Sequence, residues 1–255
     1  MITIATWNVN SIRSRLDHLK LWLEKNHIDI LCLQETKVQD ADFPIQVFSD
    51  IGFQVEFTGQ KSYNGVCILF KNQAKVFCKE IKGLDDEQKR LIAIAKDKSL
   101  FVNMYVPNGS SVGSEKFQYK LRWLNEFCHW VTERCKEFEN IFLLGDFNIA
   151  PEDLDVHDPE EWKDKILCTS TERKYIHKLE SIGFIDLFRY KNKKLKAFSW
   201  WDYRAASFRR NRGLRIDLIL AHSKNQLSYD CWIDPSPRGW EKPSDHTPVL
   251  ASIDF

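Results

Sequence analysis

The chain has 255 residues, of which 43% are hydrophobic and 29% charged, and its formal net charge is +1 at pH 7. This composition allows a large core and excludes a wholly disordered chain. The balanced charge also argues against a protein that coats nucleic acid, and favours an enzyme that meets a polyanion over one face.

Cysteine usage and the N-terminal segment predict a soluble cytoplasmic protein. The seven Cys residues include no CxxC pair, and an odd count without regular spacing is typical of a reducing compartment. A zinc site is therefore not expected. The segment MITIATW lacks the basic and apolar regions of a signal peptide, and no apolar stretch approaches the ~20 residues of a membrane helix. We expect a soluble cytoplasmic protein with no membrane partner.

Apolar runs of strand length, rich in β-branched residues, recur from one end of the sequence to the other. In chain order they predict strands at Ile2–Ala5, Ile28–Leu33, Val66–Phe70, Leu91–Ala95, Leu100–Val106, Ile141–Leu144, Leu214–Ala221 and Val249–Ile253. Helical spacing between these runs predicts helices over residues 16–23, 117–138 and 176–182, and Gly183 fits the C′ position of the last one.

The order of these elements indicates the fold class. Strands that alternate with helices predict an α/β fold. No Pro-, Gly- or Ser-rich linker divides the chain, so we expect one domain over residues 1–255. The predicted strands are too many for a small open sheet, which favours two stacked sheets.

Two segments carry opposite local charge. Residues 189–215 hold ten Lys or Arg against Asp202 alone, whereas residues 145–164 hold eight Asp or Glu against Lys163. Either segment fits a solvated surface. The basic segment also has aromatic residues at positions 198, 200, 201, 203 and 208, and cations beside stacking rings are what a groove for a nucleic-acid backbone requires.

Polar residues end or interrupt the apolar runs at five places. An amide follows the first run in TWNVN, and a carboxylate follows the second in LCLQETK. Asp146 and Asn148 lie two residues apart in LLGDFN, so both side chains can point the same way. Asp217 lies inside an apolar run, and Asp245-His246 precedes the last one.

Each of these residues also has a structural interpretation. Asn8 and the Gly-Asp-x-Asn segment fit turns, Glu35 fits a strand end, and His246 fits a hydrogen-bonded structural histidine. Asp217 favours function, because a carboxylate within an apolar strand costs several kcal/mol unless it is paired. Together the residues fit phosphodiester hydrolysis: carboxylate and amide oxygens bind a hard cation, and histidine beside a carboxylate activates water.

Seven segments closely resemble the exonuclease III / apurinic-apyrimidinic (AP) endonuclease family: TWNVNSIR, LCLQETK, YVPNG, LLGDFNIAP, FSWWDYR, GLRIDLILA and PSDHTPV. The resemblance runs from residue 4 to residue 251. It implies a four-layer, DNase I-like α/β sandwich with two stacked mixed sheets between helices. It also implies a Mg²⁺- or Mn²⁺-dependent monomer that incises double-stranded DNA 5′ to abasic sites and removes 3′ blocking groups or nucleotides.

The resemblance also implies roles for individual residues. Glu35 is expected to be the principal metal ligand, in a site that further includes Asn8, Asp146, Asn148, Asp245 and His246. Proton transfer and phosphate orientation are expected of Tyr105, Asp146, Asn148 and His246, with Asp217 holding the His246 imidazole. Whether Asp146 or His246 deprotonates the water, and whether one or two metals act, stays open.

The DNA contacts are implied in the same way. Trp200, Leu214 and Ile216 match an apolar pocket for an extrahelical abasic sugar, although Leu214 and Ile216 also fit strand packing. Further contacts are expected from Lys37, Asn108, Tyr203, Arg204 and Arg215. Some relatives place Gln or a basic residue in the loop that is small and neutral here, at residues 110–113. This leaves the ratio of exonuclease to endonuclease activity open.

Two other classes of protein are compatible with part of the pattern. Inositol-polyphosphate phosphatases and sphingomyelinases share the acidic core, but the segments FSWWDYR and GLRIDL supply stacking and backbone contacts rather than a headgroup site. A non-catalytic binding module on a retired nuclease fold would have lost some site residues. Every expected position here carries the expected residue type, which favours an enzyme.

Overall fold

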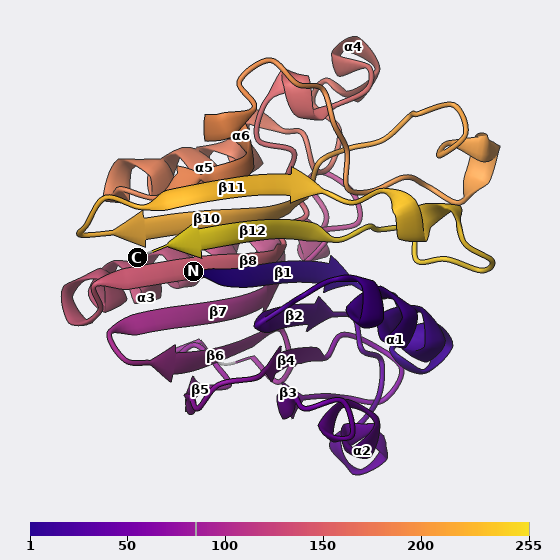
Figure 1. The fold of residues 1–255 in the computed structure, drawn as a ribbon. Helices are drawn as coiled ribbons and strands as arrows, with labels where there is room; N and C mark the ends of the chain where they lie inside the picture. Colours follow the sequence, from indigo (N-terminus) through magenta and orange to yellow (C-terminus); the bar gives the residue numbers. More distant parts are fainter. Residues whose placement is uncertain (85, 255) are drawn as a thin grey trace.

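The computed structural model describes residues 1–84 and 86–254, which form two six-stranded sheets stacked face to face (Figure 1). The first sheet has the order β11 (Ser228–Ile233), β12 (Val249–Asp254), β1 (Ile2–Asn8), β2 (Ile30–Gln34), β4 (Val66–Phe70) and β3 (Gln54–Thr58). The second has the order β5 (Lys75–Cys78), β6 (Leu91–Lys96), β7 (Ser99–Tyr105), β8 (Asn140–Asp146), β10 (Asp217–Ser223) and β9 (Ile185–Asp186). Both sheets are mixed, since β1–β2 and β7–β8 are parallel and the other pairs antiparallel.

Helices cover the outer face of each sheet. The α-helices are α1 (Leu16–Lys25), α2 (Ile45–Ser49), α3 (Glu115–Glu137), α4 (Pro159–Trp162), α5 (Ser170–Ile182) and α6 (Leu187–Lys191). Short 3-10 helices lie at Arg13–Arg15, Asp40–Asp42, Asp153–Asp155, Arg204–Ala206 and Ser236–Gly239.

Three apolar clusters join these layers. Side chains of α1 and α2 pack on the first sheet, around Trp7, Trp22 and Phe48. Side chains of α3 and α5 pack on the second sheet, around Phe127 and Ile176. The third cluster fills the space between the sheets. The layers are therefore helix, sheet, sheet and helix, which confirms the predicted four-layer α/β sandwich.

The alternation of side chains along each strand decides what faces the inter-sheet space. Ile4, Phe142, Leu144 and Ile219 belong to the inner cluster. Side chains two positions apart share a strand face, so the same inner face continues from Ile4 to Thr6 and Asn8 on β1. It continues from Leu144 to Asp146 on β8 and from Ile219 to Asp217 on β10. The inner faces of the two sheets therefore change from apolar to polar at one shared end, and this change places the candidate site.

All eight predicted apolar runs contain a strand, and all three predicted helices form. Gly183 follows α5 with φ of 111°, the left-handed conformation expected of a C′ glycine. The run predicted at Leu214–Ala221 becomes a strand only from Asp217, because Leu214 instead forms isolated bridges to Val156 and Trp200. Four strands were not predicted: β3, β5, β9 and β11. Among the described residues, no helix has the length and apolarity needed to span a membrane.

Candidate active site

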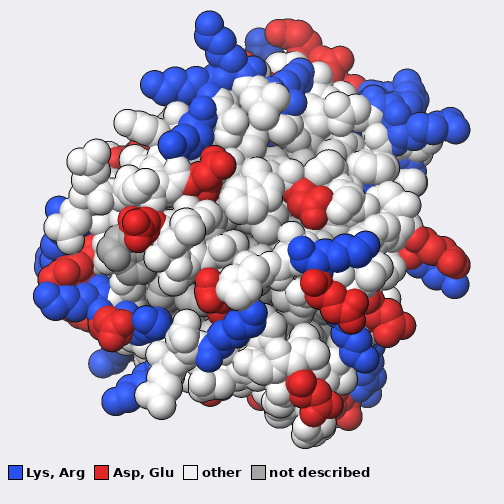
Figure 2. Space-filling model, viewed as in Figure 1, with Lys and Arg blue, Asp and Glu red and all other residues white. Residues whose placement is uncertain are grey.

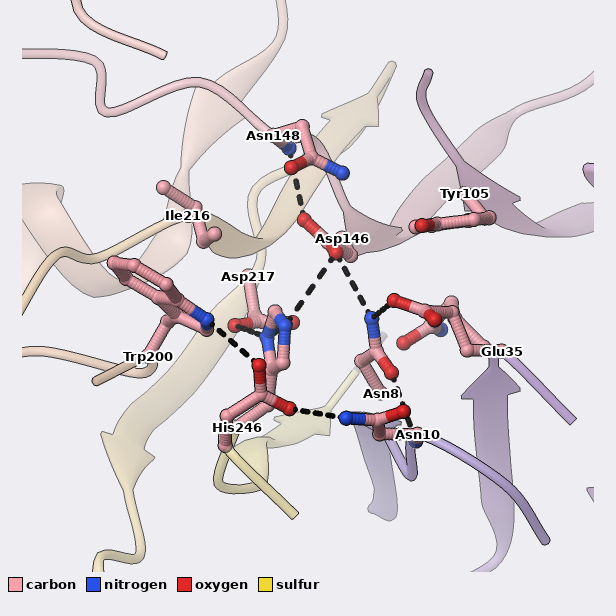
Figure 3. A network of polar contacts seen from close by, with 12 residues as sticks. Asn8, Asn10, Glu35, Tyr105, Asp146, Asn148, Trp200, Ile216, Asp217 and His246 are labelled. Carbon is pink, nitrogen blue, oxygen red and sulfur yellow. Dashed lines mark hydrogen bonds and ion pairs between the residues drawn. The ribbon is translucent and has the colours of Figure 1, made fainter. Parts of the chain in front are cut away.

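Asn8 joins the two sheets at their polar end. Its side-chain Nδ2 donates to Glu35 Oε1 at 2.8 Å and to Asp146 Oδ2 at 3.0 Å (Figure 3). Its Oδ1 accepts the backbone N–H of Asn10 at 3.0 Å, which fixes the orientation of the amide. Asn8 is fully buried. The NH₂ group of Asn8 therefore holds two carboxylates from different sheets beside each other.

Two residues reach the site because the backbone leaves the strand conformation. Glu35 follows β2 with φ of 51°, and Asn148 lies two residues after β8 with φ of 49°. Such left-handed conformations are costly for residues other than glycine and cluster at functional sites. Strand alternation would point the Glu35 side chain away from the second sheet, because Gln34 points toward it. The left-handed backbone at Glu35 breaks this alternation, and the carboxylate instead accepts a hydrogen bond from Asn8.

His246 lies between two carboxylates of the second sheet. Its Nδ1 is 2.9 Å from Asp217 Oδ2, and its Nε2 is 3.7 Å from Asp146 Oδ2. Asp217 is itself held by Ser199, whose hydroxyl donates to Oδ2 at 2.6 Å and accepts the backbone N–H of Asp217 at 3.0 Å. These contacts fix the imidazole so that Nε2 is presented to Asp146.

Burial and charge perturb both members of this pair. Burial raises the pKa of Asp146 well above its usual range, and the nearby Asp217 adds to that shift while His246 opposes it. Burial lowers the pKa of His246, but the carboxylates of Asp217 and Asp146 outweigh it and raise the pKa. Perturbed groups in contact are what proton transfer at neutral pH requires.

The remaining predicted catalytic residues border this pair. The backbone N–H of Asn148 donates to Asp146 Oδ1 at 2.9 Å, and its side chain accepts from Asn108 Nδ2 at 2.9 Å. The ring of Tyr105 lies against the Arg90 guanidinium, 4.8 Å from ring centroid to Cζ. Burial, followed by the charges of Glu35 and Asp146, raises the pKa of Tyr105, so its hydroxyl stays protonated and able to donate.

The donor set fits a divalent cation. Glu35, Asp146 and His246 each offer a ligand atom, and these atoms lie within 4.8 Å of one another. Carboxylate oxygens are the ligands that Mg²⁺ and Mn²⁺ prefer. The other predicted ligands have different neighbours. Asp245 accepts from Trp200 Nε1 at 3.0 Å and from Asn10 Nδ2 at 2.9 Å, and a direct metal contact from Asn8, Asn148 or Asp245 stays a prediction.

Three of the predicted DNA-binding residues are exposed or partly exposed. Tyr203 is 51% exposed and donates from its hydroxyl to the Pro243 carbonyl at 2.9 Å. Arg204 is exposed and pairs with Asp202 at 3.0 Å. Lys37 pairs with Glu35 at 2.8 Å. The contact of these residues with DNA stays a prediction.

The predicted sugar pocket is closed by its own side chains. Leu214 and Ile216 are buried and pack with Val156, with Trp200 partly buried against the same cluster. Trp200 and Ile216 lie beside Asp146 and Asp217 (Figure 3). The apolar cluster therefore borders Asp146 and Asp217, and Trp200 is one of its partly exposed members.

The prediction that Arg215 contacts DNA was wrong. Arg215 is fully buried and pairs with Asp155 at 2.7 Å and with Asp186 at 2.7 Å. Arg189 also pairs with Asp155, and Arg212 pairs with Glu161. Part of the basic segment thus neutralises the acidic segment within the fold. Figure 2 shows other Lys and Arg side chains gathered along the upper edge and upper right, where Figure 1 shows α6 and the orange segment before β10.

Two residues of the network were missed by sequence reasoning. Asn10 links Asp245 to Lys37, and it lies in the same TWNVN segment that drew attention to Asn8. Ser199 orients Asp217 from within FSWWDYR. Neither had a separate signal, because Asn and Ser are common in turns and only their partners give them a role.

The two-sheet sandwich and the carboxylate–histidine centre at one end of it fit a phosphodiesterase. Residues 5–246 match the model of the endonuclease/exonuclease/phosphatase family. The chain belongs to this family.

Relatives match this chain over nearly its whole length. Exodeoxyribonuclease III of Haemophilus influenzae is 34% identical, over 97% of this chain and 98% of its own length. The structure of the 3′ phosphatase NExo from Neisseria, bound to a product DNA hairpin, has a TM-score of 0.96 and 38% identity, covering 100% of both chains. An AP endonuclease from Archaeoglobus fulgidus has a TM-score of 0.91 and 39% identity, again covering 100% of both chains.

Proposed function

We propose that this protein is a Mg²⁺- or Mn²⁺-dependent DNA-repair phosphodiesterase that incises duplex DNA 5′ to abasic sites and removes 3′ blocking groups or nucleotides. The observation that carries the proposal is the group formed by Glu35, Asp146 and His246, whose ligand atoms lie within 4.8 Å of one another. The substrates are inferred from relatives named as exodeoxyribonuclease III, AP endonuclease and 3′ phosphatase. All these groups come from one chain, so the protein is proposed to act as a monomer.

The chemistry follows from the positions of the side chains. The carboxylates of Glu35 and Asp146 would hold the cation, with His246 beside them, and the cation would supply a positive charge that stabilises the anionic transition state. His246 and Asp146 are the proton-transfer groups, since they face each other at 3.7 Å and Asp217 fixes the imidazole. The Tyr105 hydroxyl would donate a hydrogen bond to the phosphate or the leaving group, and Asn148 would orient the phosphate beside Asp146.

Exposed and partly exposed residues would hold the DNA. Tyr203 and Arg204 would contact the strand, as would Lys37 and Asn108, while Trp200 would meet the sugar beside the buried Leu214 and Ile216. In the basic segment, Lys194, Arg209 and Arg210 are exposed and extend the positive surface available to phosphates.

One assay tests this function. The protein is incubated with three duplexes, which carry a tetrahydrofuran abasic analogue, a recessed 3′ end or a 3′-phosphate, in Mg²⁺, in Mn²⁺ and in EDTA. We expect cleavage or trimming in either metal and none in EDTA. No incision of the abasic duplex at any metal concentration removes the endonuclease activity from the proposal. Inactivity on all three duplexes overturns the proposal as a whole.

Glu35→Ala is expected to raise the Mg²⁺ concentration needed for half-maximal rate, because it removes one of the carboxylates that would hold the cation. Calorimetric titration of Mn²⁺ into the protein should show the same weakening without substrate. Glu56→Ala is the matched control, since Glu56 is a partly exposed strand carboxylate paired with Lys79 at 3.1 Å. An unchanged metal titration of Glu35→Ala would exclude Glu35 as a ligand.

A further inference from the structure

Lys120 is a buried cation behind the catalytic residues. It lies on α3, at a position that helical spacing assigns to the apolar face between Phe117 and Leu124, and it is 0% exposed. Lysine is almost never fully buried unless it is paired. A lysine at such a position therefore needs hydrogen-bond or ion-pair partners.

Three acceptors surround the ammonium group of Lys120. Its Nζ donates to the backbone carbonyl of Asn148 at 2.6 Å and to that of Asn108 at 3.2 Å, and it forms an ion pair with Glu172. An ammonium group has three N–H donors, so this arrangement uses all of them. Burial lowers the pKa of Lys120 and the Glu172 charge opposes that shift.

Glu172 is as completely buried as Lys120, and it is held by α5 and the loop before it. Its Oε1 accepts the backbone N–H of Leu167 at 3.1 Å, and its Oε2 accepts the hydroxyl of Thr169 at 2.6 Å. Glu172 also occupies the N3 position of the capping box that begins α5, with Thr169 as its N-cap. These contacts fix the carboxylate independently of Lys120, so the carboxylate gives the ammonium group a defined position.

The two carbonyls that Lys120 holds belong to different loops of the site. Asn108 lies in the loop after β7, and Asn148 lies in the loop after β8. These loops are also joined by the hydrogen bond from Asn108 Nδ2 to Asn148 Oδ1, at 2.9 Å, and by that from Asn148 Nδ2 to the Val106 carbonyl, at 3.0 Å. Asn148 in turn donates its backbone N–H to Asp146. Lys120 is therefore connected to the Asp146 carboxylate through one intervening residue, Asn148.

We propose that Lys120 is a positioning residue for the phosphodiesterase reaction: its ammonium group, held by Glu172, ties the Asn108 and Asn148 carbonyls together and so sets the Asn148 carboxamide beside Asp146. Asn148 adopts a left-handed backbone with φ of 49°, which a neighbouring contact must maintain. The inference rests on the proposed function, because the quantity that Lys120 sets is the geometry of that reaction.

The test compares Lys120→Met with the parent in a cleavage assay on the most rapidly processed of the three duplexes. We expect kcat to fall roughly 10- to 100-fold, the scale of a misplacement of about 1 Å in a catalytic group. KM should stay near the parent value, because Lys120 is buried and does not meet DNA. Should Lys120→Met not fold, Lys120→Gln gives the same comparison, since its shorter neutral amide cannot reach both carbonyls.

Val131→Ala separates positioning from loss of stability. It makes a cavity elsewhere on α3, so Tm should fall while kcat stays close to that of the parent. Glu172→Gln removes the carboxylate that holds the ammonium group, and it should lower kcat in the same direction as Lys120→Met. Equal kcat losses in Lys120→Met and in a control of equal Tm would overturn the positioning role. A parent protein inactive on all three duplexes would overturn the proposed function itself, and this inference with it.

Discussion

His246→Ala is expected to lower kcat by at least ~10²-fold, the scale of lost acid–base assistance. Asp217 holds Nδ1 at 2.9 Å, and Nε2 therefore faces Asp146 at 3.7 Å. Alanine removes both the proton-transfer group and the positive charge that offsets two buried carboxylates. The measurement is the single-turnover rate of duplex cleavage at saturating metal, where weakened metal binding does not contribute.

His177→Ala is the matched control for this prediction. His177 lies on α5 with its side chain 63% exposed, and it pairs only with Glu180 at the surface. We expect its rate to equal that of the parent. Asp146→Ala should reproduce the loss seen in His246→Ala, since the two groups face each other. A His246→Ala rate close to the parent rate would exclude the assigned proton-transfer role.

Asp155→Asn is expected to lower the free energy of unfolding by about 3–5 kcal/mol, the usual cost of breaking a buried ion pair by removing one partner. Asp155 is fully buried and accepts from Arg215 Nε at 2.7 Å and Nη2 at 3.1 Å, and from Arg189. The variant leaves both guanidinium groups without this carboxylate. Chemical denaturation at pH 7, monitored by tryptophan fluorescence, measures the difference.

Lowering the pH should reduce the difference in free energy of unfolding between Asp155→Asn and the parent. Burial alone would raise the pKa of Asp155, but Arg215 and Arg189 outweigh it and hold the pKa below its usual range. A carboxyl with a lowered folded-state pKa stabilises the fold above its unfolded pKa of about 3.9, and this stabilisation is lost as the pH falls through the folded value. The difference should therefore be full at pH 7 and decrease below about pH 4.

Asp153→Asn is the control for Asp155→Asn. Asp153 also pairs with an arginine, Arg173 at 2.7 Å, but its side chain is 72% exposed. An exposed pair contributes about 0–1 kcal/mol, so this variant should be close to the parent at both pH values. Equal losses of unfolding free energy in the two variants would show that the burial of Asp155 does not determine its contribution to stability.

The sequence predicted the interior strands and missed the edges for one physical reason. The four strands that were not predicted, β3, β5, β9 and β11, are the two edges of each sheet. Their residues are mostly exposed or half-buried, whereas β4, for example, is buried at every position. A strand that is covered on one side only carries no continuous apolar run, so the sequence has no signal of it. The unpredicted helices α2, α4 and α6 have only four or five residues, too few to show a helical period.

Charged residues show a second limit of sequence reasoning. Arg215 and the exposed Arg210 carry the same charge in the same basic segment, yet only the fold shows that Arg215 is buried between Asp155 and Asp186. Asp217 was correctly expected to need a partner, because its place in an apolar strand required one, and His246 is that partner. Lys120 offered a similar signal, a cation in the apolar register of α3, which the helix pattern alone did not separate from its exposed neighbours.

The position of β12 has a consequence for the order in which the enzyme is made. This strand lies between β11 and β1, so the first sheet stays open beside β1 until residues 249–254 have joined it. His246 and Asp245 immediately precede it. During synthesis, a chain that has reached only Asp217 therefore still lacks the histidine and the strand that seats it. The proposed site can form only once residues 245–254 have also been made.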